Sequence, residues 1–353
     1  MTNANGRTHV YVGAARMTAG SRGGIFRRAG DDDRWEPLTK GLPEATNVQA
    51  ITLHPTDPSV VYIGTHRGPY RSTDRGERWE RLDFPDDGTQ VWSIAVHPTD
   101  PRVLYAGASP IGVFRSDDGG DTWRRLPKAV QPDRVKMEFA CRVMRLAADP
   151  GQPEHVYAAL EVGGVMRTLD GGETWDDCTA GLLELAERPH LKSRIQSDSD
   201  AEGMLDGHAL VVSAARPGRV ILAVRMGLFR SDDGGKRWED MEVGRFSPLT
   251  YARDVRVAPH DARVLYACLS PAARSEDGSL HRSDDVGRTW TRVDRGVKAE
   301  RTMMAVALHP RDPDQVYCVS RCGQVFGTRD GGTRWHESRL PADVQDVYAI
   351  ACG

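Results

Sequence analysis

A short phrase recurs along this sequence at nearly regular intervals, and its period constrains the fold more than any other feature. Residues 112–123 read GVFRSDDGGDTW, and variants of the phrase end at six further tryptophans. The copies end at Trp35, Trp79, Trp123, Trp175, Trp238, Trp290 and Trp335. Their spacing runs from about 44 to about 63 residues, so a basic unit of about 44 residues carries insertions in its middle copies. Such a period indicates a repeat architecture.

Each unit shows the pattern of four short strands. In the unit that ends near Trp123, we expect strands over residues 91–96, 103–108, 113–116 and 122–126. Their β-branched and aromatic runs are bounded by Pro, Asp and Gly, which is typical of strands joined by tight turns. A second repeated phrase, HPTDPRVLYAGA from His97, supplies the turn between the first two strands.

Seven four-stranded units predict an all-β fold, a seven-bladed β-propeller of four-stranded antiparallel blades, because radial repetition leaves only short sheet edges. The first unit starts at its second strand, residues 9–14, while the chain finishes with an unpaired first strand, residues 346–352. We expect the last strand to complete the first blade and close the ring. The chain 1–353 is then one propeller domain, with insertions at 127–141 and 182–208.

The repeat also resembles a known family. Ser116, Asp118, Gly120, Thr122 and Trp123 fit the S-x-D-x-G-x-T-W pattern of the Asp-box, or BNR, repeat. That repeat is found in sialidases, xyloglucan-cleaving glycosidases, sortilin-type receptors and photosystem II assembly factors. The resemblance covers nearly the whole chain and implies the propeller fold, but it does not imply a single function, since such folds host many activities.

The repeated phrase is interpreted as structural. Its Asp accepts backbone N–H bonds inside a turn, its Gly residues supply positive φ, and its Trp packs between blades. In an antiparallel meander, successive turns alternate between the two faces of the ring. The regular turns therefore share one face, called the lower face, and the variable turns share the other, called the upper face. We expect binding residues on the upper face, because loops on a rigid scaffold carry function.

Composition excludes several classes of partner and cofactor. The net charge is −3, with 47 basic and 50 acidic residues, so the sequence predicts neither nucleic-acid nor membrane binding. Neither a signal peptide nor a long apolar run is visible, and we expect a cytoplasmic protein. The scattered cysteines predict reduced thiols rather than disulfides. A loop from Asp198 resembles a calcium loop but has Ala209 where a bidentate Glu belongs, so no metal and no cofactor are predicted.

The upper-face turns are rich in arginine. An inner ring of guanidinium groups in a funnel would bind carboxylate or phosphate. His208, with Asp206 two residues away, is a candidate acid or base near neutral pH. The predicted catalytic residues are His208, Asp254, Glu138 and Tyr251. The predicted ligand-binding residues are His66, Arg67, Arg142, Glu161, Arg225, Arg253, Arg301, Arg321 and Tyr348.

Three functions fit these residues. The first is a funnel that binds a small polar, anionic ligand, and this interpretation leans toward an enzyme with hydrolase-type acid–base chemistry. The alternative is a non-catalytic scaffold that uses the same face to grip a protein or an acidic peptide. The second alternative is a glycoside hydrolase resembling Asp-box glycosidases. Sialidases would supply an arginine cluster and a tyrosine nucleophile, but their motifs do not match position by position, and they have six blades.

Overall fold

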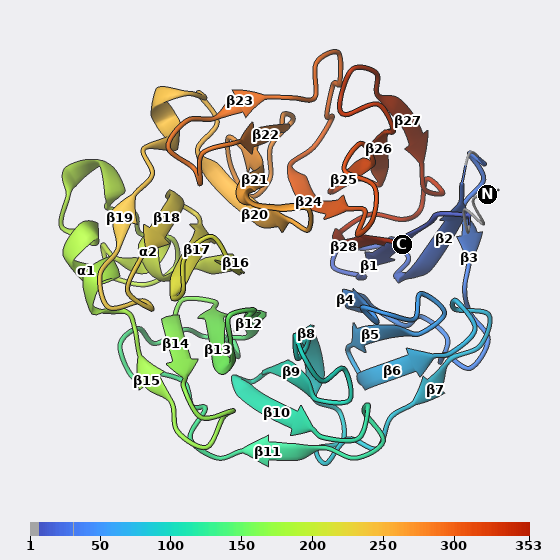
Figure 1. Cartoon of the computed structure of the whole chain (residues 1–353), viewed down its shortest axis with the longest axis horizontal. Helices are drawn as coiled ribbons and strands as arrows, with labels where there is room; N and C mark the ends of the chain where they lie inside the picture. Colours follow the sequence, from blue (N-terminus) through green and yellow to red (C-terminus); the bar gives the residue numbers. More distant parts are fainter. Residues whose placement is uncertain (1–6, 31) are drawn as a thin grey trace.

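Seven four-stranded antiparallel sheets stand around a common axis (Figure 1). The structure is a computed structural model that describes residues 7–30 and 32–353. Strand order within each sheet follows the chain from the axis outward, except in the sheet that joins the two ends. The predicted seven-bladed propeller is confirmed.

Four sets of strands build the blades. The inner strands are β4 (Val48–Leu53), β8 (Gln90–Val96), β12 (Val143–Asp149), β16 (Gly207–Ser213), β20 (Tyr251–Ala258), β24 (Met303–Leu308) and β28 (Val347–Cys352). The second strands are β1 (His9–Ala14), β5 (Val61–Thr65), β9 (Leu104–Ser109), β13 (Gln152–Leu160), β17 (Arg219–Val224), β21 (Asp261–Ser270) and β25 (Val316–Ser320). The third strands are β2 (Gly24–Ala29), β6 (Gly68–Ser72), β10 (Gly112–Ser116), β14 (Gly164–Thr168), β18 (Gly227–Ser231), β22 (Ser279–Ser283) and β26 (Gln324–Thr328). The short outer strands are β3 (Glu36–Pro37), β7 (Glu80–Arg81), β11 (Arg124–Leu126), β15 (Asp176–Asp177), β19 (Glu239–Asp240), β23 (Thr291–Arg292) and β27 (His336–Arg339).

The two ends of the chain meet in one blade. Strand β28 lies against β1 in the order β28-β1-β2-β3, with Val10 opposite Cys352 and Val12 opposite Ile350. The expected closure of the ring by the last strand is therefore confirmed. In Figure 1 the red end of the chain lies beside its blue beginning.

The repeated phrase forms the hairpin between the third and outer strands. In the blade of β10, the Asp118 carboxylate accepts the N–H of Thr122 at 2.9 Å, and Ser116 Oγ accepts the N–H of Gly120 at 2.9 Å. Gly120 has φ of 99°, a conformation that side chains with a Cβ rarely adopt. Trp123 donates its indole N–H to the Gly120 carbonyl at 2.9 Å and is 8% exposed. The Ser, Asp, Thr and Trp of the phrase thus make hydrogen bonds within the turn.

The core lies between blades rather than in one central mass. One cluster joins Tyr105 and Val113 of one blade to Val143 and Val156 of the next. The insertion 182–208 begins within α1 (Ala180–Ala186) and includes a 3-10 turn at Pro189–Leu191 and the helix α2 (Glu202–Leu205). Another 3-10 turn, Val243–Arg245, lies outside this insertion, after β19. Leu182, Leu185 and Leu191 of this insertion are buried, so it packs as a covering element over its blade. No helix in the described part of the chain is long and apolar enough to span a membrane.

Candidate functional site

Every inner strand carries a β-bulge at the same place. The pairing with the second strand skips one residue near the upper end of each inner strand. A bulge re-aims the side chain of the extra residue. The skipped residues, which we call the bulge ring, are Gln49, Trp92, Met144, His208, Arg253, Met304 and Tyr348. All of them line one constriction of about 40 Å³ in the central channel.

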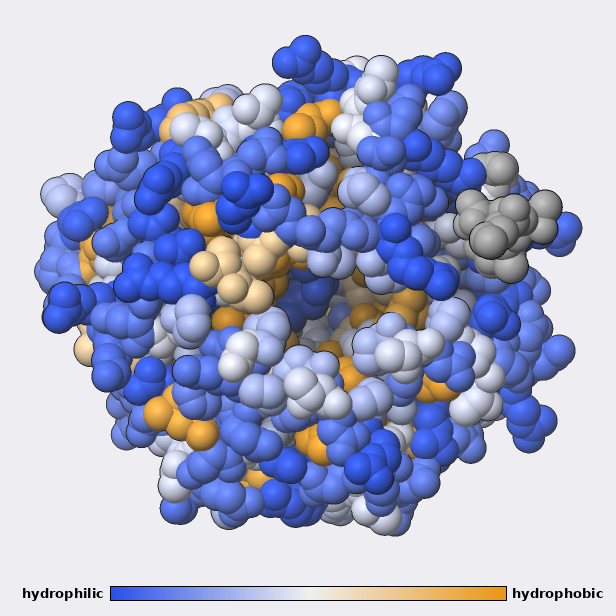
Figure 2. Space-filling view, in the orientation of Figure 1, coloured by the Kyte–Doolittle hydropathy of each residue, from blue (hydrophilic) through white to orange (hydrophobic). Residues whose placement is uncertain are grey.

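Above the bulge ring, the upper face encloses a cavity of about 170 Å³, which we call the funnel. It widens outward into a hollow of about 620 Å³, whose rim includes Phe139 and Gln196 from the two insertions. Figure 2 shows one side of the ring hollowed at its centre, with hydrophilic residues deep in the hollow. The predicted site residues that line the funnel are Arg142, Glu161, His208, Arg225, Tyr251, Arg253, Arg321 and Tyr348, and Asp206 lies among them.

His208 connects two other funnel groups. Its Nδ1 lies 2.8 Å from the carbonyl oxygen of Ala252, so Nδ1 carries the proton and donates it there. Its Nε2 lies 3.2 Å from the Tyr251 hydroxyl and 3.3 Å from Asp206 Oδ2. With Nδ1 protonated, a neutral imidazole accepts the tyrosine O–H at Nε2, whereas a protonated one donates from Nε2 to the carboxylate. The trio therefore has two hydrogen-bonded states that differ by one proton.

Two of the four funnel arginines are already paired. Arg142 Nε lies 2.6 Å from Glu161 Oε2, and its guanidinium stacks over the Trp92 ring at 4.1 Å. Arg321 donates to Asp346 at 2.8 Å and to the Ala273 carbonyl at 3.3 Å. Because protein groups hold Arg142 and Arg321 in place, these two side chains shape the wall of the funnel, and their charges are shared with the protein's own carboxyl groups.

The other two arginines are available to a ligand. Arg225 approaches a carboxylate only at 3.8 Å, from its Nε to Asp206 Oδ2. Within the described residues, the Arg253 guanidinium forms no hydrogen bond or ion pair and only lies over the Tyr348 ring at 5.7 Å. A guanidinium group left without partners in a partly enclosed cavity favours binding of a carboxylate or phosphate, which it meets with two parallel hydrogen bonds.

The two funnel carboxyl groups are shifted in opposite directions. Burial raises the pKa of Glu161 to about 7 although Arg142 opposes the shift, and the charge of Asp206 adds to it. Burial also acts to raise the pKa of Asp206, but His208 and the nearby guanidinium groups lower it below its usual value. Near neutral pH, Glu161 is therefore partly protonated and can give a proton, while Asp206 stays ionised.

Several predicted site residues lie outside the funnel. Glu138 is exposed on the first insertion, and its neighbour Phe139 reaches the rim instead. Asp254 follows the bulge at Arg253, so its side chain turns away from the funnel, is 1% exposed and accepts from Arg145 and the Val306 N–H, both at 3.1 Å. The structure therefore leaves both predicted catalytic carboxylates, Glu138 and Asp254, outside the funnel.

Three predicted ligand-binding residues also lie elsewhere. Arg301 lines a separate surface cavity beside Arg274 and faces Glu276 at 3.4 Å. At the tip between β5 and β6, His66 Nδ1 accepts the N–H of Asn47 at 3.1 Å, and its Nε2 lies 3.3 Å from Arg67 Nε. Neither His66 nor Arg67 lines the funnel or the hollow above it.

The loop that resembles a calcium site is organised by its own carboxylate. Glu202 is fully buried and accepts backbone N–H groups from Ile195, Gln196 and Ser197 at 2.8 to 3.1 Å. These bonds fix the loop and hold Gln196 at the funnel rim. Glu202 therefore has a role that sequence reasoning missed. Trp92 was missed too, although it alone among the eight tryptophans stands outside the repeated phrase.

Comparison with known proteins adds a group of carbohydrate-active relatives. No protein-family model matches the chain. Over 358 residues it is 24% identical to a probable oligoxyloglucan-reducing end-specific xyloglucanase of Neosartorya fischeri, an alignment that covers 89% of this chain and 37% of that protein. It also matches 29% of the length of a Paenibacillus xyloglucanase at 28% identity. The chain thus spans well under half of these relatives and is similar to part of each.

Solved structures show the same fold. The GH74 xyloglucanase of Xanthomonas campestris matches with a TM-score of 0.62 and 20% identity, over 86% of this chain and 46% of that one. YCF48 bound to a D1 peptide matches with a TM-score of 0.54 and 15% identity, over 85% of this chain and 83% of that one. The chain is therefore a propeller similar to those of glycoside hydrolases.

Proposed function

We propose that the funnel is the active site of a glycoside hydrolase that acts on a small acidic carbohydrate. One observation carries this proposal: a cavity of about 170 Å³ holds two carboxyl groups with oppositely shifted pKa values and two arginines free to bind an anion. A pair of carboxyl groups, one protonated and one ionised, is the usual equipment for cleaving a glycosidic bond.

Arg225 and Arg253 bind the carboxylate or phosphate of the substrate in this proposal. A neutral sugar offers these guanidinium groups only hydroxyl acceptors, whereas a carboxylate or phosphate also balances their charge through two parallel, charge-assisted hydrogen bonds. The proposed substrate is therefore an acidic sugar derivative rather than a neutral glucan. The bulge ring closes the funnel below, so the substrate enters from the upper face.

Glu161 and Asp206 carry the chemistry. Protonated Glu161 gives its proton to the glycosidic oxygen as the bond to the anomeric carbon breaks, and the Asp206 carboxylate stabilises the positive charge that develops on the sugar ring. Water then adds to the anomeric carbon and returns a proton to Glu161. His208 holds Asp206 and Tyr251 at 3.3 and 3.2 Å and so acts as a positioning residue.

Similarity to xyloglucanases supports the glycosidase class. Two curated relatives bear that name and align with 89% of this chain. The acidic substrate is inferred from Arg225 and Arg253 of this chain and not from those relatives.

The test uses paired 4-nitrophenyl glycosides that differ only in a carboxylate, such as glucuronides and glucosides, together with xyloglucan oligosaccharides. We expect the acidic member of a pair to be hydrolysed preferentially. For an acidic disaccharide, whose sugar alcohol needs a proton to leave, Glu161→Gln should lower kcat by about 10²–10⁴-fold, because the proton donor is lost. Arg225→Ala or Arg253→Ala should raise KM by about tenfold or more for the acidic substrate alone.

A matched control is Arg237→Ala. The Arg237 side chain is 92% exposed beside Asp233 on the lower-face hairpin, so its loss should leave kcat and KM unchanged. Equal hydrolysis of the neutral and acidic substrates, or full activity in the Glu161→Gln variant, would exclude the proposal.

A second candidate function is non-catalytic binding of an acidic peptide by the same funnel. The structural likeness to YCF48 bound to a D1 peptide favours this candidate. The match covers 85% of this chain and 83% of the YCF48 chain, so the two proteins are similar over nearly their whole lengths. Affinity for an acidic peptide that depends on Arg225 and Arg253, without hydrolysis of any glycoside and without any effect of Glu161→Gln, would support this candidate instead.

A further inference from the structure

The lower end of the channel holds a second cavity that the proposed function does not use. It measures about 680 Å³, within the range of small-molecule pockets, and we call it the lower chamber. Its inner end meets the constriction of the bulge ring, because Ile51, Ile94, Arg145 and Arg256 line both spaces. The chamber therefore narrows to the constriction at its inner end and opens toward the lower face.

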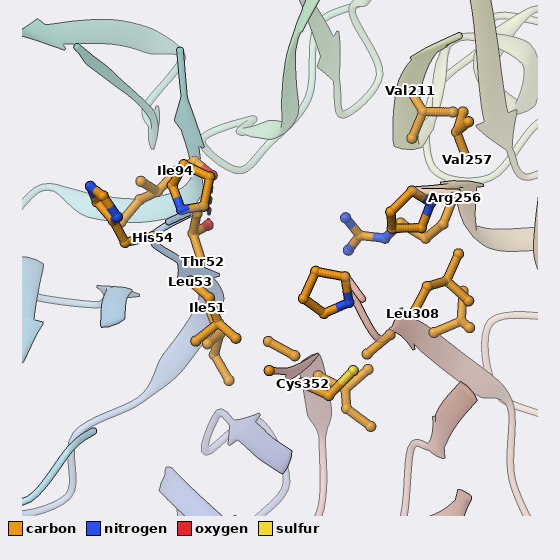
Figure 3. A pocket seen from close by; sticks show the side chains of 18 of the residues that line it. Ile51, Thr52, Leu53, His54, Ile94, Val211, Arg256, Val257, Leu308 and Cys352 are labelled. Carbon is orange, nitrogen blue, oxygen red and sulfur yellow. Dashed lines mark hydrogen bonds between the residues drawn. The ribbon is translucent and has the colours of Figure 1, made fainter. Parts of the chain in front are cut away.

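The wall of the lower chamber is mostly apolar. Figure 3 shows aliphatic side chains from several inner strands directed into it, including Ile51, Leu53, Ile94, Val257 and Leu308. The turns of the lower face add prolines at the mouth. The Thr52 hydroxyl is already used, since it donates to the Ile94 carbonyl at 2.7 Å. An occupant of this wall needs a long apolar portion.

The charged side chains of the lower chamber are all basic, and Gly353, the last residue of the sequence, also lies in its wall. Arg145, Arg256 and Arg311 line it, and no Asp or Glu among the described residues does. Arg145 and Arg256 share one carboxylate, that of Asp254, at 3.1 and 3.2 Å. Asp254 is 1% exposed, whereas the two arginine side chains are 26% and 32% exposed to the channel. Figure 3 shows the Arg256 guanidinium projecting toward the middle of the cavity.

The surplus positive charge is also visible at Arg145. Burial and the neighbouring charge of Arg256 together lower the pKa of Arg145 to about 10, although the Asp254 carboxylate opposes the shift. Arg145 Nε is buried without a hydrogen-bond partner in the described structure. An anion in the chamber would meet the exposed parts of the Arg145 and Arg256 guanidinium groups and balance their charge.

From this charge pattern we propose that the lower chamber binds a single-chain amphipathic carboxylate of the fatty-acid type, with its head at Arg145 and Arg256 and its alkyl chain along the apolar wall. Arg145 and Arg256 lie at the inner end beside the constriction, whereas Arg311 belongs to a turn at the mouth. The apolar surface lies between them, so the ligand enters head first. An alkyl chain needs no polar partner along the wall, whereas each amide of a peptide does. This contrast favours a fatty-acid-type ligand over the carboxyl end of an apolar peptide.

The test is calorimetric titration of the full chain with straight-chain carboxylates from hexanoate to dodecanoate, and with dodecanol, all below their micelle concentrations. We expect the affinity to rise by about fourfold for each added methylene that is buried. Arg256→Met should weaken dodecanoate binding by about tenfold or more while leaving dodecanol binding unchanged.

A second variant keeps the proposal testable if Arg256→Met disturbs the fold. Ile51→Trp leaves every charge in place and narrows the chamber at its inner end, so it should weaken binding of both dodecanoate and dodecanol. Arg237→Met, on the exposed lower-face hairpin, is the control that should change nothing. Equal affinity for dodecanoate and dodecanol, affinity independent of chain length, or tighter binding of an apolar peptide with a free carboxyl end would overturn the proposal.

Discussion

A single carboxyl group, that of Glu161, is expected to set the pH range in which the funnel works. Its pKa of about 7 keeps it protonated below neutral pH, so kcat should fall as the pH rises through about 7. The Glu161→Gln variant should lose this limb of the pH profile along with most of its activity. Rates measured from pH 5 to 9 check the prediction, and a wild-type rate that stays constant across pH 7 would contradict it.

The same residue links pH to stability. Because folding raises the pKa of Glu161 from its ordinary value of 4.5, its stabilising contribution is complete below that value and is lost as the pH rises through about 7. The free energy of unfolding should therefore fall between pH 5 and pH 8 more steeply in the wild type than in Glu161→Gln. Urea unfolding of both proteins at the two pH values makes the comparison.

Arg253 and Asp254 are neighbours in β20 with opposite roles, because a β-bulge interrupts the pairing of β20 with β21 at this place. Arg253 is skipped in the pairing and lies in the funnel, whereas Asp254 returns to the ladder opposite Cys268 and is buried below. One residue of shift in a strand reverses the direction of the side chain. Sequence reasoning placed both residues at the upper end of this strand, and the bulge separates them.

At the scale of the strand, the residue that follows the bulge is small in all inner strands except β12 and β20. In β4, β8, β16, β24 and β28 these small residues are Ala50, Ser93, Ala209, Ala305 and Ala349. In β12 and β20 it is Arg145 and Asp254, which form an ion pair at 3.1 Å. Small residues fit close to the axis, and two charged residues fit there only as partners.

This pairing predicts a coupling between strands of two non-adjacent blades. Asp254→Ala should destabilise the fold by about 3 kcal/mol, because it removes the buried carboxylate and leaves Arg145 and Arg256, both partly buried, side by side without it. The double variant Arg145→Ala/Asp254→Ala should cost less than the two single changes together, with a coupling of about 1–3 kcal/mol. Free energies of unfolding for the four proteins of the cycle measure it, and simple additivity would show that the ion pair carries no coupling.

At the scale of the whole molecule, the ring depends on one seam between β28 and β1. His9 and Gly353 exchange both backbone hydrogen bonds, so Val10 and Cys352 form the next, non-hydrogen-bonded pair, in which side chains stand close. A Val10→Cys variant is therefore expected to form a disulfide with Cys352. The sealed ring should be about 2–4 kcal/mol more stable than the reduced form of the same variant.

Melting temperatures of the oxidised and reduced forms test the seam. A Val10→Cys variant that also carries Cys352→Ser should show no difference between the two conditions. A disulfide that forms without raising the melting temperature would mean that unfolding does not begin with opening of this blade.

The sequence by itself determined the number of blades, their four strands, the closure by the last strand and the face on which the variable turns lie. These follow from a local repeat and from the alternation of turns in an antiparallel meander, and neither depends on distant contacts. Tertiary structure decided which upper-face residues meet. The bulges bring His208, Arg253 and Tyr348 into the channel, and the paths of the insertions leave Glu138 outside. The lower chamber also exists only in the closed ring, because its walls come from strands hundreds of residues apart, such as β4 and β28, that ring closure makes neighbours.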